Sequence, residues 1–247
     1  MTKWLQIVLL TNASFSQELA LKQVIPLHGD THHVQGVEVE DISLWVTSVD
    51  TSKKAGLLFE FDLTTGTMRR SVELQKGGHY HPGGLMSDGD SLWIPVAEYK
   101  RNSSAVIQRR SKRTLELQSE FIVTDHIGAV AVVPEGLAGV NWDARDIYVW
   151  TKDGKLIRKI SNPSGVAIQD MKFVNGELVG GGLLPDKAGA IVWFEWPSLN
   201  IKRKLNVGRT DRNMAYTHEG MAIKGNKLYF VPEDSSSRLF VFSLNLR

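Results

Sequence analysis

The stretch Gly78-His79-Tyr80-His81-Pro82-Gly83-Gly84-Leu85, followed by Ser87-Asp88-Gly89 and Leu92-Trp93-Ile94-Pro95, decides the fold of this chain. It predicts a loop, a short apolar strand, a tight turn and a second strand. Four related stretches occur elsewhere. They are His33-Val34-Gln35-Gly36-Val37, His126-Ile127-Gly128-Ala129-Val130, Gln169-Asp170-Met171 and His218-Glu219-Gly220-Met221. The chain therefore contains five copies of one structural unit.

The spacing of the five units predicts the architecture. One leucine in each unit can be taken as equivalent, and the successive separations are 48, 45, 41 and 50 residues for Leu44, Leu92, Leu137, Leu178 and Leu228. Periods of this length, with several short strands in each repeat, are typical of β-propeller blades. Apolar residues alternate or come in short runs, without long helical periodicity. We therefore predict an all-β, five-bladed β-propeller, because a sandwich or barrel does not explain five aligned units.

The last unit has only three predicted strands, at residues 219–224, 227–232 and 238–244. Residues 19–27 resemble the outer strands of other units, such as residues 68–74. An N-terminal strand that completes the last blade would close the ring and remove its open edges. Residues 17–247 are therefore expected to form a single propeller domain.

The first 16 residues allow two interpretations. Lys3 precedes a short apolar run, and Ser14-Phe15-Ser16 offers small residues for a signal-peptidase cut before Gln17. The segment is either a signal peptide of an exported protein or a disordered N-terminus, and the compartment stays open.

Composition narrows the class of partner. The 247 residues carry a formal net charge of +2, 42% hydrophobic residues and no cysteine. This balance gives no reason to expect nucleic acid or a membrane as partner, and it excludes disulfides and thiolate metal sites. We expect a monomer that binds a small polar molecule.

Glycines and aromatic residues at repeated positions have structural explanations. Gly36, Gly84 and Gly220 fit close packing at the crowded propeller axis, where a side chain would clash. The aromatic residues Trp45, Trp93 and Tyr229 are predicted to be core.

Histidines mark the candidate site. All seven lie in connections that lead into an innermost strand, which places them at one mouth of the central channel: His28, His32, His33, His79, His81, His126 and His218. A second set of equivalent residues, which are acidic, follows the second strands, at Asp50, Glu98, Asp143 and Asp234 with Asp186 close to the fifth place. Turn-capping is the simpler explanation of the acids. The histidines could bind a ligand, bond neighbouring carbonyls, or hold a catalytic metal.

Part of the chain resembles the plant-type glutaminyl cyclases, which are five-bladed propellers with the active site at the channel mouth. The resemblance is carried by three elements, Val34-Gln35-Gly36-Val37 with Leu44-Trp45, Gln169-Asp170-Met171-Lys172-Phe173 and Glu219-Gly220-Met221-Ala222. It implies that Gln35 is the active-site glutamine of that family. Gly83 stands where the family has its catalytic glutamate, and Val231-Pro232-Glu233-Asp234 where it has a lysine.

The chain also resembles an uncharacterised propeller family of bacteria and fungi. The shared elements are His-His-x-Gln-Gly, Tyr-His-Pro-Gly-Gly, Val-Ala-Glu-Tyr and Asp-His-Ile-Gly, at residues 32–36, 80–84, 96–99 and 125–128. This resemblance implies the fold and leaves the reaction open.

Together these features predict an enzyme pocket for a small polar molecule at the histidine-bearing mouth, with a non-catalytic binding or protein-interaction propeller as the alternative. A glutaminyl-cyclase-like acyltransferase is a further alternative, which the resemblance implies. The expected catalytic residues are His81, Glu98, Glu219 and Asp170. The expected ligand-binding residues are Gln35, His33, His126, His218 and Tyr80. A divalent metal is the one cofactor considered, held by His33, His81 and His126.

Overall fold

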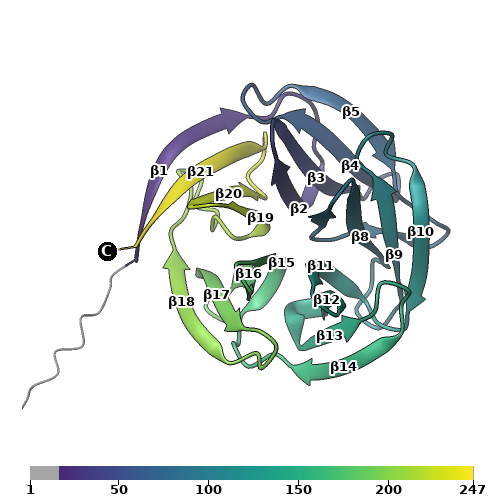
Figure 1. Cartoon of the computed structure of the whole chain (residues 1–247). Helices are drawn as coiled ribbons and strands as arrows, with labels where there is room; N and C mark the ends of the chain where they lie inside the picture. The colour runs from purple at the N-terminus through teal and green to yellow at the C-terminus, as the bar shows by residue number, and fades with distance from the viewer. Residues whose placement is uncertain (1–16, 247) are drawn as a thin grey trace, which may run out of the picture.

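The computed structural model describes residues 17–246, which form five antiparallel β-sheets arranged in a ring (Figure 1). In these residues the only helical segment is a short 3₁₀ turn, η1, at Trp142–Ala144. No helix in this part of the chain is long and apolar enough to cross a membrane. The predicted five-bladed β-propeller is confirmed.

Each blade is one sheet, and its strands follow in chain order from the channel outward. Blade 1 contains β2 (His33–Glu40), β3 (Ser43–Asp50), β4 (Ala55–Asp62) and β5 (Met68–Glu73). Blade 2 contains β6 (His79–Pro82), β7 (Met86–Asp88), β8 (Ser91–Glu98), β9 (Ala105–Ser111) and β10 (Leu117–Val123). Blade 3 contains β11 (Ile127–Val133), β12 (Gly136–Asn141), β13 (Asp146–Trp150) and β14 (Leu156–Ser161). Blade 4 contains β15 (Ala167–Val174), β16 (Glu177–Leu183), β17 (Gly189–Glu195) and β18 (Ile201–Val207).

Blade 5 is built from both ends of the chain. Its strands are β19 (Glu219–Lys224), β20 (Lys227–Pro232), β21 (Arg238–Leu246) and the N-terminal β1 (Gln17–Pro26). Strand β1 pairs antiparallel with β21 over its whole length and forms the outer edge of the blade (Figure 1). The predicted closure of the ring by an N-terminal strand is therefore confirmed. The predicted signal peptide falls on residues 1–16, which lie outside the described residues.

Blade 2 differs from the prediction at its innermost strand. Instead of the one short strand predicted before the tight turn, two short strands, β6 and β7, both pair with β8. Between them the chain leaves β8 and joins the neighbouring blade. The N–H of Gly84 donates to the Gly128 carbonyl at 2.9 Å, and the N–H of Val130 donates to the Gly84 carbonyl at 3.0 Å. The interruption thus gives blades 2 and 3 a backbone connection beside the channel.

The core is divided among the five junctions between blades. Each of five buried apolar clusters combines side chains from two neighbouring blades. Trp93 packs with Ile127 and Trp150 between blades 2 and 3, for example. Trp45 and Tyr229 are likewise buried in such clusters, which confirms their structural role.

The glycines at the axis are there because the inner strands approach closely. A Cβ on Gly36 would lie 2.5 Å from the Cα of Gly84, and one on Gly84 would lie 2.4 Å from an Asp170 oxygen. A Cβ on Gly220 would lie 2.6 Å from Val37. Since contacts this short do not occur between real atoms, these positions exclude any side chain.

Candidate functional site

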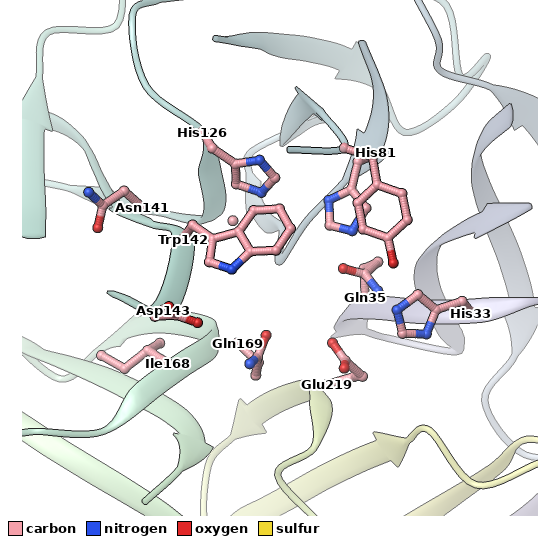
Figure 2. A pocket seen from close by; sticks show the side chains of 12 residues that line it. His33, Gln35, His81, His126, Asn141, Trp142, Asp143, Ile168, Gln169 and Glu219 are labelled. Atoms are coloured by element: carbon pink, nitrogen blue, oxygen red, sulfur yellow. The ribbon is translucent and has the colours of Figure 1, made fainter. Parts of the chain in front are cut away.

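A cavity of about 160 Å³ opens at the predicted mouth of the channel (Figure 2). All five blades contribute to it, and we call it the mouth pocket. Its lining residues are His33, Gln35, His81, Tyr99, His126, Gly128, Asn141, Trp142, Asp143, Ile168, Gln169 and Glu219. The predicted site residues His33, Gln35, His81, His126 and Glu219 are therefore brought together.

One repeated position supplies much of the lining. The offsets that align Leu44 with its equivalents also align Gln35, Gly128, Gln169 and Glu219. The first three are extra residues in β-bulges, because the register of each inner strand shifts around them. A bulge redirects a side chain out of the regular alternation and is common beside active sites. The sequence analysis identified Gln35 and Glu219 but missed Gln169, although the same offsets would have found it.

Glu219 has the most unusual conformation in the pocket. The φ angle of Glu219 is +99°, a value that residues other than glycine rarely adopt. The residue is only 5% exposed. Within residues 17–246 its carboxyl group makes no hydrogen bond, and Nε2 of His218 lies 3.6 Å away. Burial raises the pKa of Glu219 to about 8, with the nearby charge of Glu233 adding to the effect and that of His33 opposing it. The group is therefore largely protonated at neutral pH.

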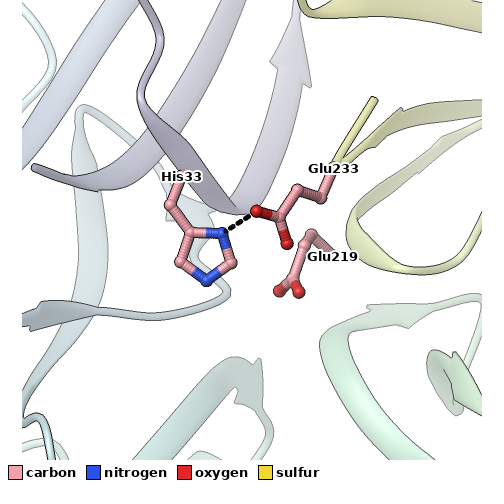
Figure 3. A group of neighbouring side chains, drawn as sticks. All are labelled: His33, Glu219 and Glu233. Atoms are coloured by element: carbon pink, nitrogen blue, oxygen red, sulfur yellow. Dashed lines mark ion pairs between the residues drawn. The ribbon is translucent and has the colours of Figure 1, made fainter. Parts of the chain in front are cut away.

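A histidine–glutamate pair stands beside Glu219 (Figure 3). Nδ1 of His33 lies 2.8 Å from Oε1 of Glu233, which follows β20. Burial lowers the pKa of His33, but the contact with Glu233 and the charges of Glu219 and Glu233 outweigh it, so the net shift is upward. The same contact lowers the pKa of Glu233. The pKa values of the two neighbouring glutamates are thus shifted in opposite directions, so Glu219 can hold a proton while Glu233 is ionised.

An aromatic wall is formed by His81, Tyr99, His126 and Trp142. Figure 2 shows His81, His126 and Trp142 across the pocket from Glu219. His81 stacks on Tyr99 with ring centroids 4.3 Å apart, and His126 meets Trp142 edge-on at 4.5 Å. Burial, and repulsion from the other two histidines, lowers the pKa of His81 to about 3. Burial also lowers the pKa of His126, whose Nδ1 donates to the carbonyl oxygens of Glu98 and Lys100 at 2.9 and 3.1 Å. Both imidazoles are therefore neutral at physiological pH.

The loop after β12 brings Trp142 into this wall. Asp143 and Ala144 have φ values of +60° and +50°, and this tight turn makes the short η1 segment possible. Arg101 lies 5.9 Å above the indole ring and pairs with Asp143. Trp142 and Tyr99 were missed by the sequence analysis. Tyr99 stands next to the predicted Glu98, but no repeat offset marks Trp142.

The predicted trio of metal ligands does not gather around one point. Nδ1 of His126 is used by two backbone carbonyls, and His33 lies on the opposite side of the pocket (Figure 2). Among the described residues, one group of three has its donor atoms within 4.8 Å of one another, namely His33, Glu219 and Glu233. We call this group the mouth cluster. It is close enough to hold a cation, but the proton on Glu219 removes one of its two carboxylate charges.

Three predicted site residues lie beside the pocket rather than in it. The Glu98 carboxylate binds Lys100 at 2.6 Å and Ser104 at 3.2 Å, so only its backbone reaches His126. Tyr80 contacts the edge of the Tyr99 ring. His218 lines an adjoining groove and has Nδ1 3.0 Å from the Met214 sulfur.

Asp170 has a structural role. It is fully buried and pairs with Lys172, which is 1% exposed, at 2.6 Å. Asp170 accepts the N–H groups of Val37 in blade 1 and Met221 in blade 5, at 2.9 and 3.1 Å. Lys172 donates to the carbonyl of Leu85 in blade 2 at 2.8 Å. This pair therefore connects four blades at the axis, and neither side chain lines the mouth pocket.

The acidic residues that follow the second strands have local partners. Asp50 accepts the Ser52 hydroxyl at 2.6 Å, and this bond holds the pKa of Asp50 near 2. Asp234 pairs with Arg212 and Arg238. Asp50 also accepts the N–H groups of Ser52 and Lys53, which fits turn capping, whereas Asp234 is held by ion pairs.

Solved structures show what the fold is similar to. The glutaminyl cyclase of Myxococcus xanthus matches with a TM-score of 0.70 and 12% identity, over 94% of this chain and 99% of that one. The Pan2 WD40 domain of Neurospora crassa matches at 0.53 and 6%, over 93% and 96%. A protein of unknown function from Bacteroides caccae matches at 0.52 and 12%, over 80% and 70%. At these identities the similarity concerns the fold alone.

No curated protein matches the sequence. Residues 2–176, which are well over half of the chain, match the family of unknown function DUF6454. This chain folds as a five-bladed propeller with a histidine-lined mouth pocket. It belongs to the DUF6454 family.

Proposed function

We propose that the protein is an enzyme that acts on a small, neutral, polar molecule by general acid–base catalysis in the mouth pocket. Glu219 is the acid, and His33, oriented by Glu233, is the base. Glu219 donates its proton to an oxygen of the substrate. His33 removes a proton from the group that reacts with the substrate. A positioned acid–base pair typically contributes 10²–10⁴-fold to a rate.

The observation that carries this proposal is the state of Glu219. It combines a φ of +99°, 5% exposure and a carboxyl group without a hydrogen bond in the described part of the chain. Backbone strain of this kind costs roughly 1–3 kcal/mol and clusters at functional sites. The carboxyl group lines the cavity, and no hydrogen bond within the described residues accounts for its position there. A fold that keeps both features at a cavity wall is best explained if the carboxyl group acts on a ligand.

The glutaminyl cyclase of Myxococcus xanthus has a similar fold and is itself an enzyme, which supports an enzymatic use of this fold. Its chemistry does not transfer directly. Gly83 stands where the glutaminyl cyclases have their catalytic glutamate, and a Cβ there would lie 2.0 Å from the Gly128 carbonyl oxygen. No side chain can occupy that position, so the acid here comes from a different blade.

The test compares Glu219→Gln with Glu98→Gln, since Glu98 is a carboxylate near the mouth that does not line the pocket. Each protein is incubated with a mixed pool of neutral metabolites of low mass, and consumption is followed by mass spectrometry. We expect the wild type and Glu98→Gln to convert the same compound, and Glu219→Gln to be at least about 100-fold slower. The wild-type kcat/KM should fall as pH rises through about 8, because Glu219 then loses its proton.

Two results would contradict the proposal. Equal conversion by the wild type and Glu219→Gln would remove Glu219 from catalysis. Saturable binding of a compound with no conversion would instead favour the non-catalytic binding propeller. Metal analysis of the active protein is run alongside, because a stoichiometric ion at the mouth cluster would replace the proton assigned to Glu219.

A further inference from the structure

The mouth pocket has two chemically different sides. Tyr99 and Trp142 present ring surface on one side, where Tyr99 is exposed and Trp142 is half-buried. Glu219, Gln35 and Gln169 present polar groups on the other (Figure 2). A ligand that matches both sides must carry an apolar face and a polar edge.

Several of the polar groups are without partners. Within residues 17–246 no hydrogen bond is formed by the side chains of His81, Gln169, Glu219 or Tyr99, by the Trp142 indole N–H, or by Oε1 of Gln35. Of these atoms, Nδ1 of His81 is fully enclosed, and the others are open to the cavity or to solvent. Gln35, His81 and Glu219 are at least nine-tenths buried. Buried polar groups are nearly always hydrogen-bonded in folded proteins. Their convergence on one cavity indicates a ligand with several hydrogen-bonding groups.

The unpartnered groups of the pocket include both hydrogen-bond donors and acceptors, and this mixture narrows the chemical class of the ligand. The Trp142 indole can only donate and the Gln35 oxygen can only accept, whereas the Gln169 amide and the Tyr99 hydroxyl can do both. A hydroxyl group donates once and accepts twice, so a ring of hydroxyls can satisfy all of these groups at once. A carboxylate or an ammonium ion satisfies only half of the set.

Size and charge agree with this chemistry. The volume of about 160 Å³ lies below the roughly 300–1,000 Å³ of sites for drug-sized ligands, so a single small ring fits. Little charge faces the cavity, because its buried histidines are neutral, Glu219 is protonated and Asp143 is paired with Arg101.

We propose that the mouth pocket binds a polyhydroxylated ring of monosaccharide size, a neutral sugar or cyclitol, whose apolar C–H face lies on Trp142 and Tyr99 and whose hydroxyls meet Gln35, Gln169 and Glu219. This assignment rests on the proposed acid–base function and names its substrate class. It places Trp142 and Gln169 as the residues that determine specificity.

The experiment measures binding to Glu219→Gln protein, which should hold the ligand without converting it. The probes are glucose, galactose, mannose, xylose and myo-inositol, with cyclohexanecarboxamide and δ-valerolactam as ring-sized compounds that lack the hydroxyls. Ligand-observed saturation-transfer NMR gives both the affinity and the ring face in contact. We expect at least one polyol to bind saturably, with the strongest transfer to the protons of one face.

Two variants in the Glu219→Gln background localise the binding. Trp142→Ala should weaken it by about tenfold or more, because a stacked ring face is lost. Trp196→Ala is the matched control, since Trp196 is also a partly buried tryptophan under an arginine but lies outside the pocket. Gln169→Leu removes an amide that has no partner in the described protein, so it should leave folding unchanged and weaken polyol binding by about tenfold.

The outcomes separate the two proposals. If the polyols fail to bind but the lactam or the amide binds in a Trp142-dependent way, the sugar assignment is wrong and the acid–base site stands. Equal losses in Trp142→Ala and Trp196→Ala, with no loss in Gln169→Leu, would also overturn the sugar assignment, because binding would then lie elsewhere. Failure of the acid–base function is read separately, from conversion that survives Glu219→Gln in the metabolite pool.

Discussion

Two groups of buried charged residues lie along the same channel, and they differ in how their polar atoms are used. The Asp170–Lys172 pair is fully buried, and its atoms bond to one another and to backbone groups of the surrounding blades. The mouth cluster combines a buried Glu219 with a half-buried His33 and a Glu233 side chain that is 43% exposed, and the Glu219 carboxyl group has no hydrogen bond within the described residues. The first group completes the fold, and the second is available to a ligand.

The comparison shows that burial of a charged residue does not identify its role. Both Asp170 and Glu219 lie on inner strands and both were predicted to be catalytic. What separates them is hydrogen-bond satisfaction and backbone conformation, since Asp170 has neither a free oxygen nor a positive φ. A catalytic carboxyl group needs a free atom at a cavity, and only Glu219 has one.

The largest effect should come from breaking the Asp170–Lys172 pair. Asp170→Asn leaves Lys172 buried without a counter-ion, so we expect the free energy of unfolding to fall by about 3–5 kcal/mol in chemical denaturation. Glu219→Gln should not lower it, because the native carboxyl group is uncharged and unbonded. If Asp170→Asn and Glu219→Gln had the same small effect, the division between a structural and a functional group would be lost.

Replacing both members of the pair gives the control. Asp170→Leu combined with Lys172→Met removes the unpaired charge, so it should recover part of the stability lost in Asp170→Asn. Full recovery is not expected, because the N–H groups of Val37 and Met221 then lack an acceptor.

A smaller effect should reveal the backbone strain at Glu219. Glycine in a strand is normally less stable than alanine by roughly 0.5–1 kcal/mol. At residue 219 the order should reverse, with Glu219→Gly more stable than Glu219→Ala by about 1 kcal/mol, because glycine accepts a φ of +99°. Ala222→Gly in the same strand is the matched control and should show the normal order. The normal order at both positions would mean that Glu219 is not strained.

The sequence predicted the fold well because the repeat encodes it directly. Five leucines at blade-length spacing and an unpaired last blade were enough for the ring and its closure by β1. The break between β6 and β7 could not be predicted, since it depends on a contact between Gly84 and Gly128 that are far apart in sequence. Repeat offsets locate strands, but they do not show which blade a backbone group will join.

The site was predicted in position and only partly in composition. His33, Gln35, His81, His126 and Glu219 share repeat positions that lead to the mouth, so sequence could find them. Trp142 and Glu233 stand just before the equivalent residues Asp143 and Asp234, but the residue type at that position changes from blade to blade and gives no signal. Asp170 and Glu219 look alike in sequence, because hydrogen-bond partners from other blades are not visible there.

The central claim is that Glu219 is a buried carboxylic acid, protonated near neutral pH, and a direct titration tests it. The protein is produced with glutamate labelled at the side-chain carboxyl carbon, and chemical shifts are followed by ¹³C NMR from pH 3 to 10. The resonance that disappears in Glu219→Gln identifies the group. We expect it to titrate near pH 8, with that of Glu38 near 7 because Glu38 is also buried. A Glu219 resonance that titrates near the ordinary value of 4.5 would contradict the account.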